Sequence, residues 1–250
     1  MRNGEFTGFP ALGVHWQRME SNALKAAYGM GPEQKGVLVR KVAPLSNASA
    51  LLKPGDIIMS FDNVQIASDG TVPFRTGERI AFSYLTSQRF TGEKAHVTIM
   101  REGKILELDV ELCLPSSLVA PHLRGNDPSY MVVAGFVFTP LTEPYLDSEF
   151  GCEYSSDAPV KLLQELYFGE KRDADQELVV LSQVLACDAT LGYEELNNIR
   201  VKTFNGVDVR NLRHLAEMVY RCEERFLRFD LEYDVRVCVD QQRIFAVCLC

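Results

Sequence analysis

The sequence of 250 residues lacks a membrane-spanning segment, a signal peptide and the motif of a nucleophilic serine. No run approaches the roughly 18 to 20 consecutive apolar residues that a membrane-spanning helix requires, so we expect no membrane span. Residues 1–6 lack the long apolar segment of a signal peptide. No serine stands in a G-x-S-x-G or G-x-S-G-G context, so no catalytic residue is predicted.

Paired cysteines are also missing. The seven cysteines are scattered without a C-x-x-C pair, a pattern that fits neither a disulfide framework nor a zinc site. We therefore expect reduced thiols, an intracellular protein, no metal and no other cofactor. Only Cys248 and Cys250 stand close together, and alternation along a terminal strand explains their spacing as easily as metal binding does.

Positive charge is scarce in the second half of the chain. Residues 126–250 carry 12 basic and 22 acidic side chains, a net charge of −10, whereas residues 1–125 carry 14 and 12, a net charge of +2. Nucleic-acid binding needs concentrated lysine and arginine, so no nucleic-acid partner is predicted.

The sequence does contain an internal repeat. Residues 35–42 align with residues 177–184, and residues 58–66 with residues 201–209, at offsets of 142 and 143 residues. A repeat of this length indicates two copies of one small domain. In each copy a short apolar segment after a small-residue turn precedes the aligned β-branched run, and two alternating strands close the unit.

Turns and helices are predicted at matching places in the two copies. The dipeptides Asp62-Asn63 and Asn205-Gly206 tolerate the positive φ of tight hairpin turns. Helix-like segments follow at residues 78–88 and 211–222. The first copy has an extra loop at residues 68–77.

These elements predict a mainly β fold of the α+β class, in which two partly open β-barrels, each capped by a helix, stand in tandem. We place the first domain at residues 1–126 and the second at residues 127–250. The second carries an insertion at residues 145–176, with a helix predicted over residues 158–167.

A candidate binding site lies where the first strand of the first copy begins. If that strand is at the edge of its sheet, its unpaired N–H and C=O groups can take an extended peptide as an additional strand. Successive backbone N–H groups at the preceding turn can bind a carboxylate. The candidate residues are Ala11, Leu12, Gly13 and Val14, followed by His15 and Trp16. Trp16 either flanks the peptide or covers the end of the barrel.

Four segments carry a resemblance to a known family: residues 8–17 (GFPALGVHWQ), 52–58 (LKPGDII), 69–80 (DGTVPFRTGERI) and 132–138 (VVAGFVF). They resemble the PDZ domains of the Deg serine proteases, which are protease Do-like and HtrA-related, particularly the plant-type members. The resemblance runs through almost the whole chain and makes both copies PDZ-like. It implies peptide or unfolded-protein segments as ligands, and a Deg-type protease domain and further copies of the chain as partners.

Two further groups of residues belong to this prediction. In the first copy, Ile80 and Tyr84, at i and i+4 of the expected helix, are assigned to the other wall of the groove. In the second copy the corresponding loop is Ala134, Gly135, Phe136 and Val137. Because its phenylalanine is bulky and an insertion follows, a regulatory or assembly surface is favoured there over a peptide site.

The leading hypothesis is a regulatory PDZ tandem that recognises protein C-termini or exposed hydrophobic segments for a Deg-type serine endopeptidase in protein quality control. The alternative is a stand-alone PDZ adaptor without any protease. The resemblance leaves the compartment open among chloroplast, mitochondrion and nucleus.

Overall fold

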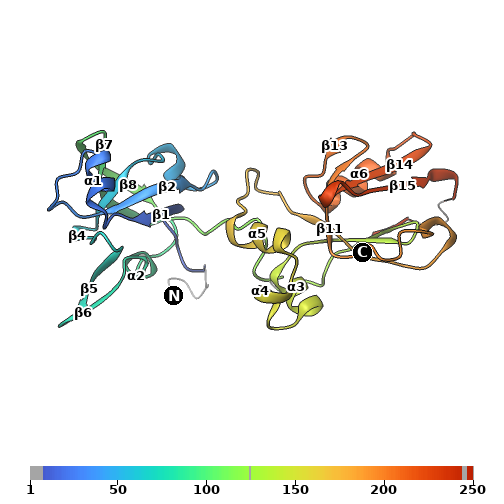
Figure 1. Cartoon of the computed structure of the whole chain (residues 1–250), viewed down its shortest axis with the longest axis horizontal. Helices are drawn as coiled ribbons and strands as arrows, with labels where there is room; N and C mark the ends of the chain where they lie inside the picture. The colour runs from blue at the N-terminus through green and yellow to red at the C-terminus, as the bar shows by residue number, and fades with distance from the viewer. Residues whose placement is uncertain (1–7, 124, 244–246, 250) are drawn as a thin grey trace. The chain divides into compact units, whose positions relative to one another are not determined.

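The computed structural model describes residues 8–123, 125–243 and 247–249. The chain divides into two compact units, Met1–Ser116 and Ser117–Cys250, and each is taken by itself below (Figure 1). The sequence analysis places this boundary about ten residues later, at residue 126. The boundary at residue 126 stays a prediction of where two domains can be separated.

The first unit is built on an antiparallel sheet in the order β1-β2-β3-β7-β8, with β4 paired to β3. Its β-branched and alternating segments form the predicted strands: β1 (Val14–Arg18), β2 (Val37–Val42), β3 (Ile57–Phe61), β4 (Val64–Gln65), β7 (Lys94–Arg101) and β8 (Lys104–Glu111). Asp62 and Asn63 adopt φ of 48° and 62°, which confirms the predicted tight turn between β3 and β4. One face of the sheet packs into a core around Ile58, Phe61 and Val97.

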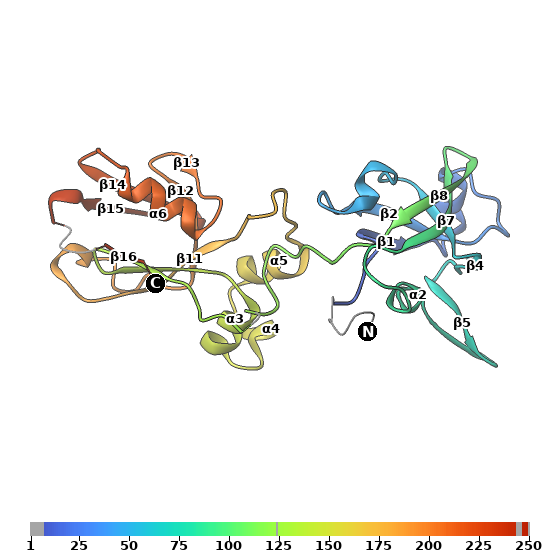
Figure 2. The same ribbon diagram turned by 180° about the vertical axis from the view of Figure 1, so that it is seen from behind.

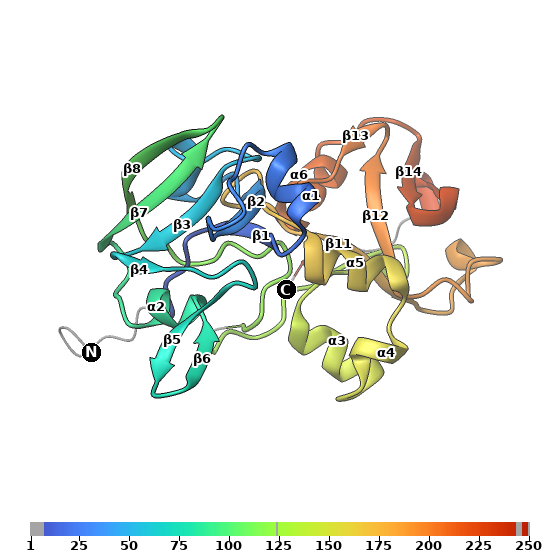
Figure 3. The ribbon, with the colours of Figure 1, turned by 60° about the vertical axis from the view of Figure 1, so that its left-hand side comes forward.

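The helix predicted over residues 78–88 is wrong in its first half. Residues 78–81 form strand β6 (Glu78–Ala81), which pairs with β5 (Thr71–Arg75), and only α2 (Ser83–Ser87) is helical. The hairpin forms in place of a helix because Gly77, with φ of 80°, supplies its turn. The Asp69 carboxylate, which accepts the N–H of Thr71 at 2.9 Å, also stabilises the start of β5. A run as short as residues 78–81 does not distinguish helix from strand by itself. The hairpin projects beside α2, away from the main sheet (Figure 3).

The first unit also contains a short helix and a second, smaller core. Helix α1 (Asn22–Ala27) begins after Ser21, whose hydroxyl accepts the N–H of Leu24. A methionine-rich cluster forms a second, smaller core in this unit: Met19, Met30, Leu38, Ile57 and Met100. The described 3-10 turns are η1 (Asn47–Ala50) in the first unit, and η2 (Asp188–Thr190), η3 (Glu232–Asp234) and η4 (Gln241–Arg243) in the second.

The second unit holds a longer antiparallel sheet in the order β15-β14-β12-β11-β10-β9-β16, with β13 paired to β12 (Figure 2). Its strands are β9 (Met131–Val133), β10 (Phe136–Pro140), β11 (Val179–Val184), β12 (Ile199–Phe204), β13 (Val207–Asp208), β14 (Phe226–Leu231), β15 (Arg236–Asp240) and β16 (Val247–Leu249). Helix α6 (Leu212–Tyr220) starts where the sequence predicts, since the Asn211 side chain accepts the N–H of His214 at 2.7 Å. Its buried side chains, Leu215 among them, pack on the sheet.

The insertion of the second unit contains three helices rather than one: α3 (Glu143–Phe150), α4 (Tyr154–Asp157) and α5 (Val160–Phe168). The predicted helix corresponds to α5, which Pro159 precedes. The three helices enclose a small core of their own around Leu146 and Leu162. No helix in the described part of the chain is long and apolar enough to cross a membrane.

Candidate functional site

The loop at residues 11–14 of the first unit is held in place at both ends. The Ala11 N–H donates to the carbonyl of Cys113 at 2.8 Å, which fixes the loop beside the end of β8. The Gly13 carbonyl accepts the N–H of Ala43 at 2.8 Å. Gly13 has φ of 74°, and a Cβ there would lie 2.3 Å from the Cβ of Ser46, so only glycine fits this position without a local shift.

Two successive backbone N–H groups in this loop stand out. Those of Leu12 and Gly13 have no hydrogen-bond acceptor among the residues that the structure describes. The N–H of Ala11 is already used by Cys113. Adjacent backbone N–H groups that lack protein acceptors are suited to an anion such as a carboxylate. The part of the loop that can receive one is therefore Leu12-Gly13.

Side chains alternate along the strand that follows this loop. Leu12 is buried, and Val14 and Trp16 are half-buried against the core of the first unit, whereas His15 is exposed. The Trp16 ring lies 5.3 Å from that of Phe82, measured between ring centroids. Of the two roles considered for Trp16, the contact with Phe82 supports the one in which it covers the core.

Strand β1 lies at the edge of its sheet. It pairs with β2 on one side, and no described strand pairs with its other side. An edge strand presents N–H and C=O groups to which a further strand can be added. The Met19 N–H, just after β1, donates to the carbonyl of Ser68 at 2.8 Å, so the available edge ends there.

Ile80 and Tyr84, which the sequence analysis assigned to the second wall of the peptide groove, do not share a helix face. Ile80 lies in β6, opposite Val72, and is half-buried against the core. Tyr84 lies in the first turn of α2, and its ring meets that of Phe74 edge-on, with 5.2 Å between centroids. The structure thus brings Tyr84 together with an aromatic residue of the β5–β6 hairpin that the sequence analysis did not select.

The corresponding loop of the second unit has a different role. Ala134 and Gly135, with φ of 49° and 92°, form the two-residue turn that joins β9 to β10. Phe136 and Val137 begin β10, which pairs with β11 on one side and with β9 on the other. Strand β9 in turn pairs with β16. The position beside β1 at which no described strand pairs is thus filled beside β10 by β9.

Sequence reasoning missed β9, and it offered a terminal strand at Cys248 and Cys250 only as an alternative to metal binding. Residues 131–133 are apolar and precede the Ala-Gly dipeptide directly, which is the signature of a hairpin. Strand β16 contains Cys248, and Cys250 lies outside the described residues. Near the turn, the thiol of Cys187 lies 3.4 Å from the Ala134 carbonyl oxygen, and its hydrogen bond with Thr190 lowers its pKa.

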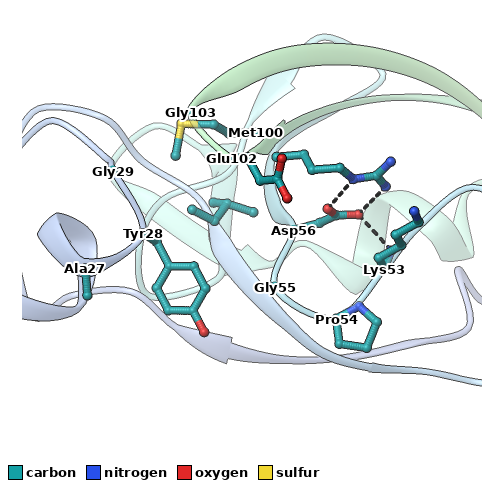
Figure 4. A pocket seen from close by; sticks show the side chains of 12 residues that line it. Ala27, Tyr28, Gly29, Lys53, Pro54, Gly55, Asp56, Met100, Glu102 and Gly103 are labelled. Carbon is teal, nitrogen blue, oxygen red and sulfur yellow. Dashed lines mark hydrogen bonds and ion pairs between the residues drawn. The ribbon is translucent and has the colours of Figure 1, made fainter.

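A hollow of about 550 Å³ in the first unit is lined in part by Asp56 and Arg101, which form an ion pair (Figure 4). Asp56 is buried, and its two carboxylate oxygens each accept a 2.7 Å hydrogen bond from the Arg101 guanidinium. The backbone N–H of Lys53 adds a third bond to the same carboxylate at 2.7 Å. Asp56 therefore closes the turn before β3, and its hydrogen bond and ion pair with Arg101 raise the pKa of that guanidinium.

Two family models match the chain along its length. Both are described as a PDZ domain, and they cover residues 10–112 and 119–247. The chain belongs to the PDZ domain family. The match confirms the predicted tandem, and the sheets of both PDZ domains remain open, as expected for partly open barrels.

The relatives of the chain include protease Do-like proteins. The chain is 43% identical to Protease Do-like 2, chloroplastic, of Arabidopsis thaliana over 249 residues, which is 100% of this chain and 40% of that protein. It is 39% identical to Protease Do-like 4, mitochondrial, of the same plant, over 92% of this chain and 41% of that protein. A solved structure of the HtrA-type protease AlgW with a decapeptide aligns at 28% identity and a TM-score of 0.33, over 42% of this chain and 29% of that one.

The predicted resemblance to the tandem PDZ region of Deg-type proteases is confirmed by these similarities. The chain spans about 40% of the length of the curated relatives that it matches.

Proposed function

We propose that the first PDZ domain captures the C-terminus of a protein, or an exposed hydrophobic segment, by adding it as a strand to the edge of β1. The single observation that supports this best is the combination of the β1 edge, which pairs with no further described strand, with the Leu12 and Gly13 N–H groups, which have no described acceptor. The N–H groups suit a terminal carboxylate, and Leu12 and Val14 offer apolar surface to the last side chain of the ligand.

In this proposal the tandem regulates a Deg-type serine endopeptidase in protein quality control. Its support is the similarity to protease Do-like proteins over the whole chain. Two of those relatives are named as chloroplastic and mitochondrial, which favours these compartments over the nucleus. The second PDZ domain, with the edge of β10 filled, serves regulation or contacts between copies rather than peptide capture.

The binding part is tested by titrating the chain with a library of labelled C-terminal peptides, each as free acid and as amide, and measuring fluorescence anisotropy. We expect binding that is weakened at least about tenfold when the carboxylate becomes an amide, because charge-assisted hydrogen bonds to two N–H groups are lost. Binding that is indifferent to the amide would contradict the role of Leu12-Gly13.

The adaptor function without a protease is the second candidate. The adaptor hypothesis predicts the same peptide binding as the protease hypothesis, so sequencing the transcript is needed to distinguish them. A reading frame for a trypsin-like domain joined to this chain supports the protease, and its absence supports the adaptor. The chain itself is expected to leave casein intact, because no serine in it has a nucleophile motif. Cleavage well above background would overturn this expectation.

A further inference from the structure

The β5–β6 hairpin of the first PDZ domain is anchored where β1 ends. The Met19 N–H, after β1, donates to the carbonyl of Ser68, three residues before β5. The N–H of Phe82 donates to the carbonyl of Gly70 at 3.0 Å, which ties the start of α2 to the same place. The Trp16 ring covers this junction so closely that a Cβ on Gly70 would lie 2.2 Å from it. The hairpin is thus a fixed extension beside the end of β1.

The apolar surface of the core continues onto this extension. Val72 is fully buried, and its strand partner Ile80 is half-buried against the core. Further out, Phe74 remains 40% exposed, and the half-buried ring of Tyr84 meets it edge-on. The guanidinium of Arg75 lies 4.9 Å from the centre of the Phe74 ring. An exposed pair of aromatic rings therefore stands at the outer end of the apolar surface.

Charge does not explain this surface. The hairpin segment, residues 69–81, carries two acidic and two basic side chains: Asp69, Glu78, Arg75 and Arg79. The Arg79 guanidinium is engaged with Thr71, at 2.7 Å from the hydroxyl and 2.9 Å from the carbonyl. A ligand residue recognised here is consequently selected for its apolar or aromatic character, not for its charge.

The length of a peptide bound along β1 determines which of its residues comes close to Phe74 and Tyr84. A peptide whose carboxylate lies at Leu12-Gly13 runs antiparallel to β1, because it approaches the loop from the far end of the strand. Strands advance about 3.3 Å per residue, so the last peptide residue lies beside Val14 and about the fifth from the end lies beside Arg18. That fifth residue and its predecessor leave the sheet where the hairpin begins.

We infer that Phe74 and Tyr84 form an upstream subsite that favours a large apolar or aromatic side chain at about the fifth residue from the C-terminus of the ligand. This inference rests on the proposed binding of a C-terminal peptide to β1. It assigns a specificity role to the extra loop of the first copy, and it keeps Tyr84 but not Ile80 in contact with the ligand.

The test uses two labelled peptides with free carboxylates, Gly-Gly-Phe-Ser-Val-Leu-Val and Gly-Gly-Ser-Ser-Val-Leu-Val, and the amide of the first. The phenylalanine peptide is expected to bind about fivefold more tightly than the serine peptide, in line with the worth of one aromatic contact. Phe74→Ser should remove this difference, whereas Phe74→Leu should keep part of it. Ile105→Ser is the matched control, because Ile105 is 59% exposed on β8 and distant in the sheet from β1.

The outcomes separate the subsite from the site on which it rests. Carboxylate-dependent binding with equal affinity for both peptides would overturn the subsite alone. Failure of both peptides to bind, as acid or amide, would overturn the capture of C-terminal peptides and the subsite with it. Loss of preference in Phe74→Ser supports the subsite only if Trp16 fluorescence shows that the first PDZ domain remains folded.

Discussion

The two PDZ domains share a glycine-containing loop but use it in opposite ways. In the first, Gly13 leads into β1, whose outer edge has no described partner strand. In the second, Gly135 is part of a hairpin turn, and β9 and β16 cover the edge of β10. A glycine with positive φ before a strand therefore does not identify a binding loop by itself. What distinguishes the two domains is whether the chain supplies its own neighbouring strand.

A second contrast concerns the residue that directly precedes the third repeated strand. Asp56 precedes β3 and is bound by the guanidinium of Arg101. Asn198 occupies the same place before β12, and its side-chain oxygen accepts the hydroxyl of Tyr145, from a helix of the insertion. The start of this strand is thus stabilised by a buried charge pair in one domain and by a neutral hydrogen bond in the other.

The largest effect is expected from Asp56→Ala, which should lower the free energy of unfolding of the first domain by about 4 kcal/mol, because it leaves the Arg101 charge without its partner. Trp16 is the only tryptophan, so urea unfolding followed by its fluorescence reports on this domain. The double variant Asp56→Ala/Arg101→Met should recover part of the loss. A loss below about 1 kcal/mol for Asp56→Ala would show that the pair is not a main support of the domain.

The next effect is expected from Val132→Pro in β9. This strand is paired on both sides, so the lost N–H and the clash of the ring should cost the second domain about 3 kcal/mol. In urea unfolding followed by circular dichroism, the second domain should unfold at a lower urea concentration. The transition followed by Trp16 fluorescence, which reports on the first domain, should stay unchanged. Val132→Thr keeps the N–H and the branched shape and serves as the control. If proline at this position leaves the transition in place, β9 contributes little to the second domain.

The two loop glycines offer a direct comparison. Gly13→Ala should weaken the binding of free-acid peptides at least about tenfold, because the new Cβ would lie 2.3 Å from that of Ser46 and displace the loop. Gly135→Ala introduces comparable strain, with Thr190 and Cys187 about 3 Å away, but should lower only the stability of the second domain. Equal losses of affinity in the two variants would erase the distinction between the loops.

The smallest effect is expected from Tyr145→Phe, which removes one buried hydrogen bond and should cost the second domain about 1 kcal/mol at neutral pH. Burial raises the pKa of Tyr145 to about 12, whereas an unfolded tyrosine titrates near 10. The unfolded chain therefore loses this proton first, and the stability of the domain should fall as the pH rises from about 10 to 12. In Tyr145→Phe the stability of the second domain should fall less between about pH 10 and 12 than in the unmodified protein. If both proteins lose the same stability over this range, the loss is due to other groups.

Local chemistry explains why much of the fold was predictable. The β-branched runs, the Asp62-Asn63 and Asn205-Gly206 turns and the Asn211 cap each specify structure within a few residues, and the structure keeps them. Pairings set by tertiary contacts were not predictable in the same way. Residues 78–81 suit either a helix or a strand, and the residues after 240 have no pattern of their own until β16 pairs with β9.

The candidate site shows the same limit. Residues 11–16 could be selected because loop and strand are contiguous in the sequence. Tyr84 was selected for a helical spacing with Ile80 that does not exist, and its actual neighbour Phe74 comes from the hairpin. No sequence signal pairs those two rings, because their contact depends on the anchoring of the hairpin beside α2.

The edge position of β1 also bears on how the protein behaves in concentrated solution. Two copies of an edge strand can pair with each other, and long, flat, apolar edges of this kind seed aggregates. This one is only five residues long and displays the exposed polar side chains of His15 and Arg18. Those features discourage self-pairing, so the polarity of β1 is expected to contribute to colloidal stability.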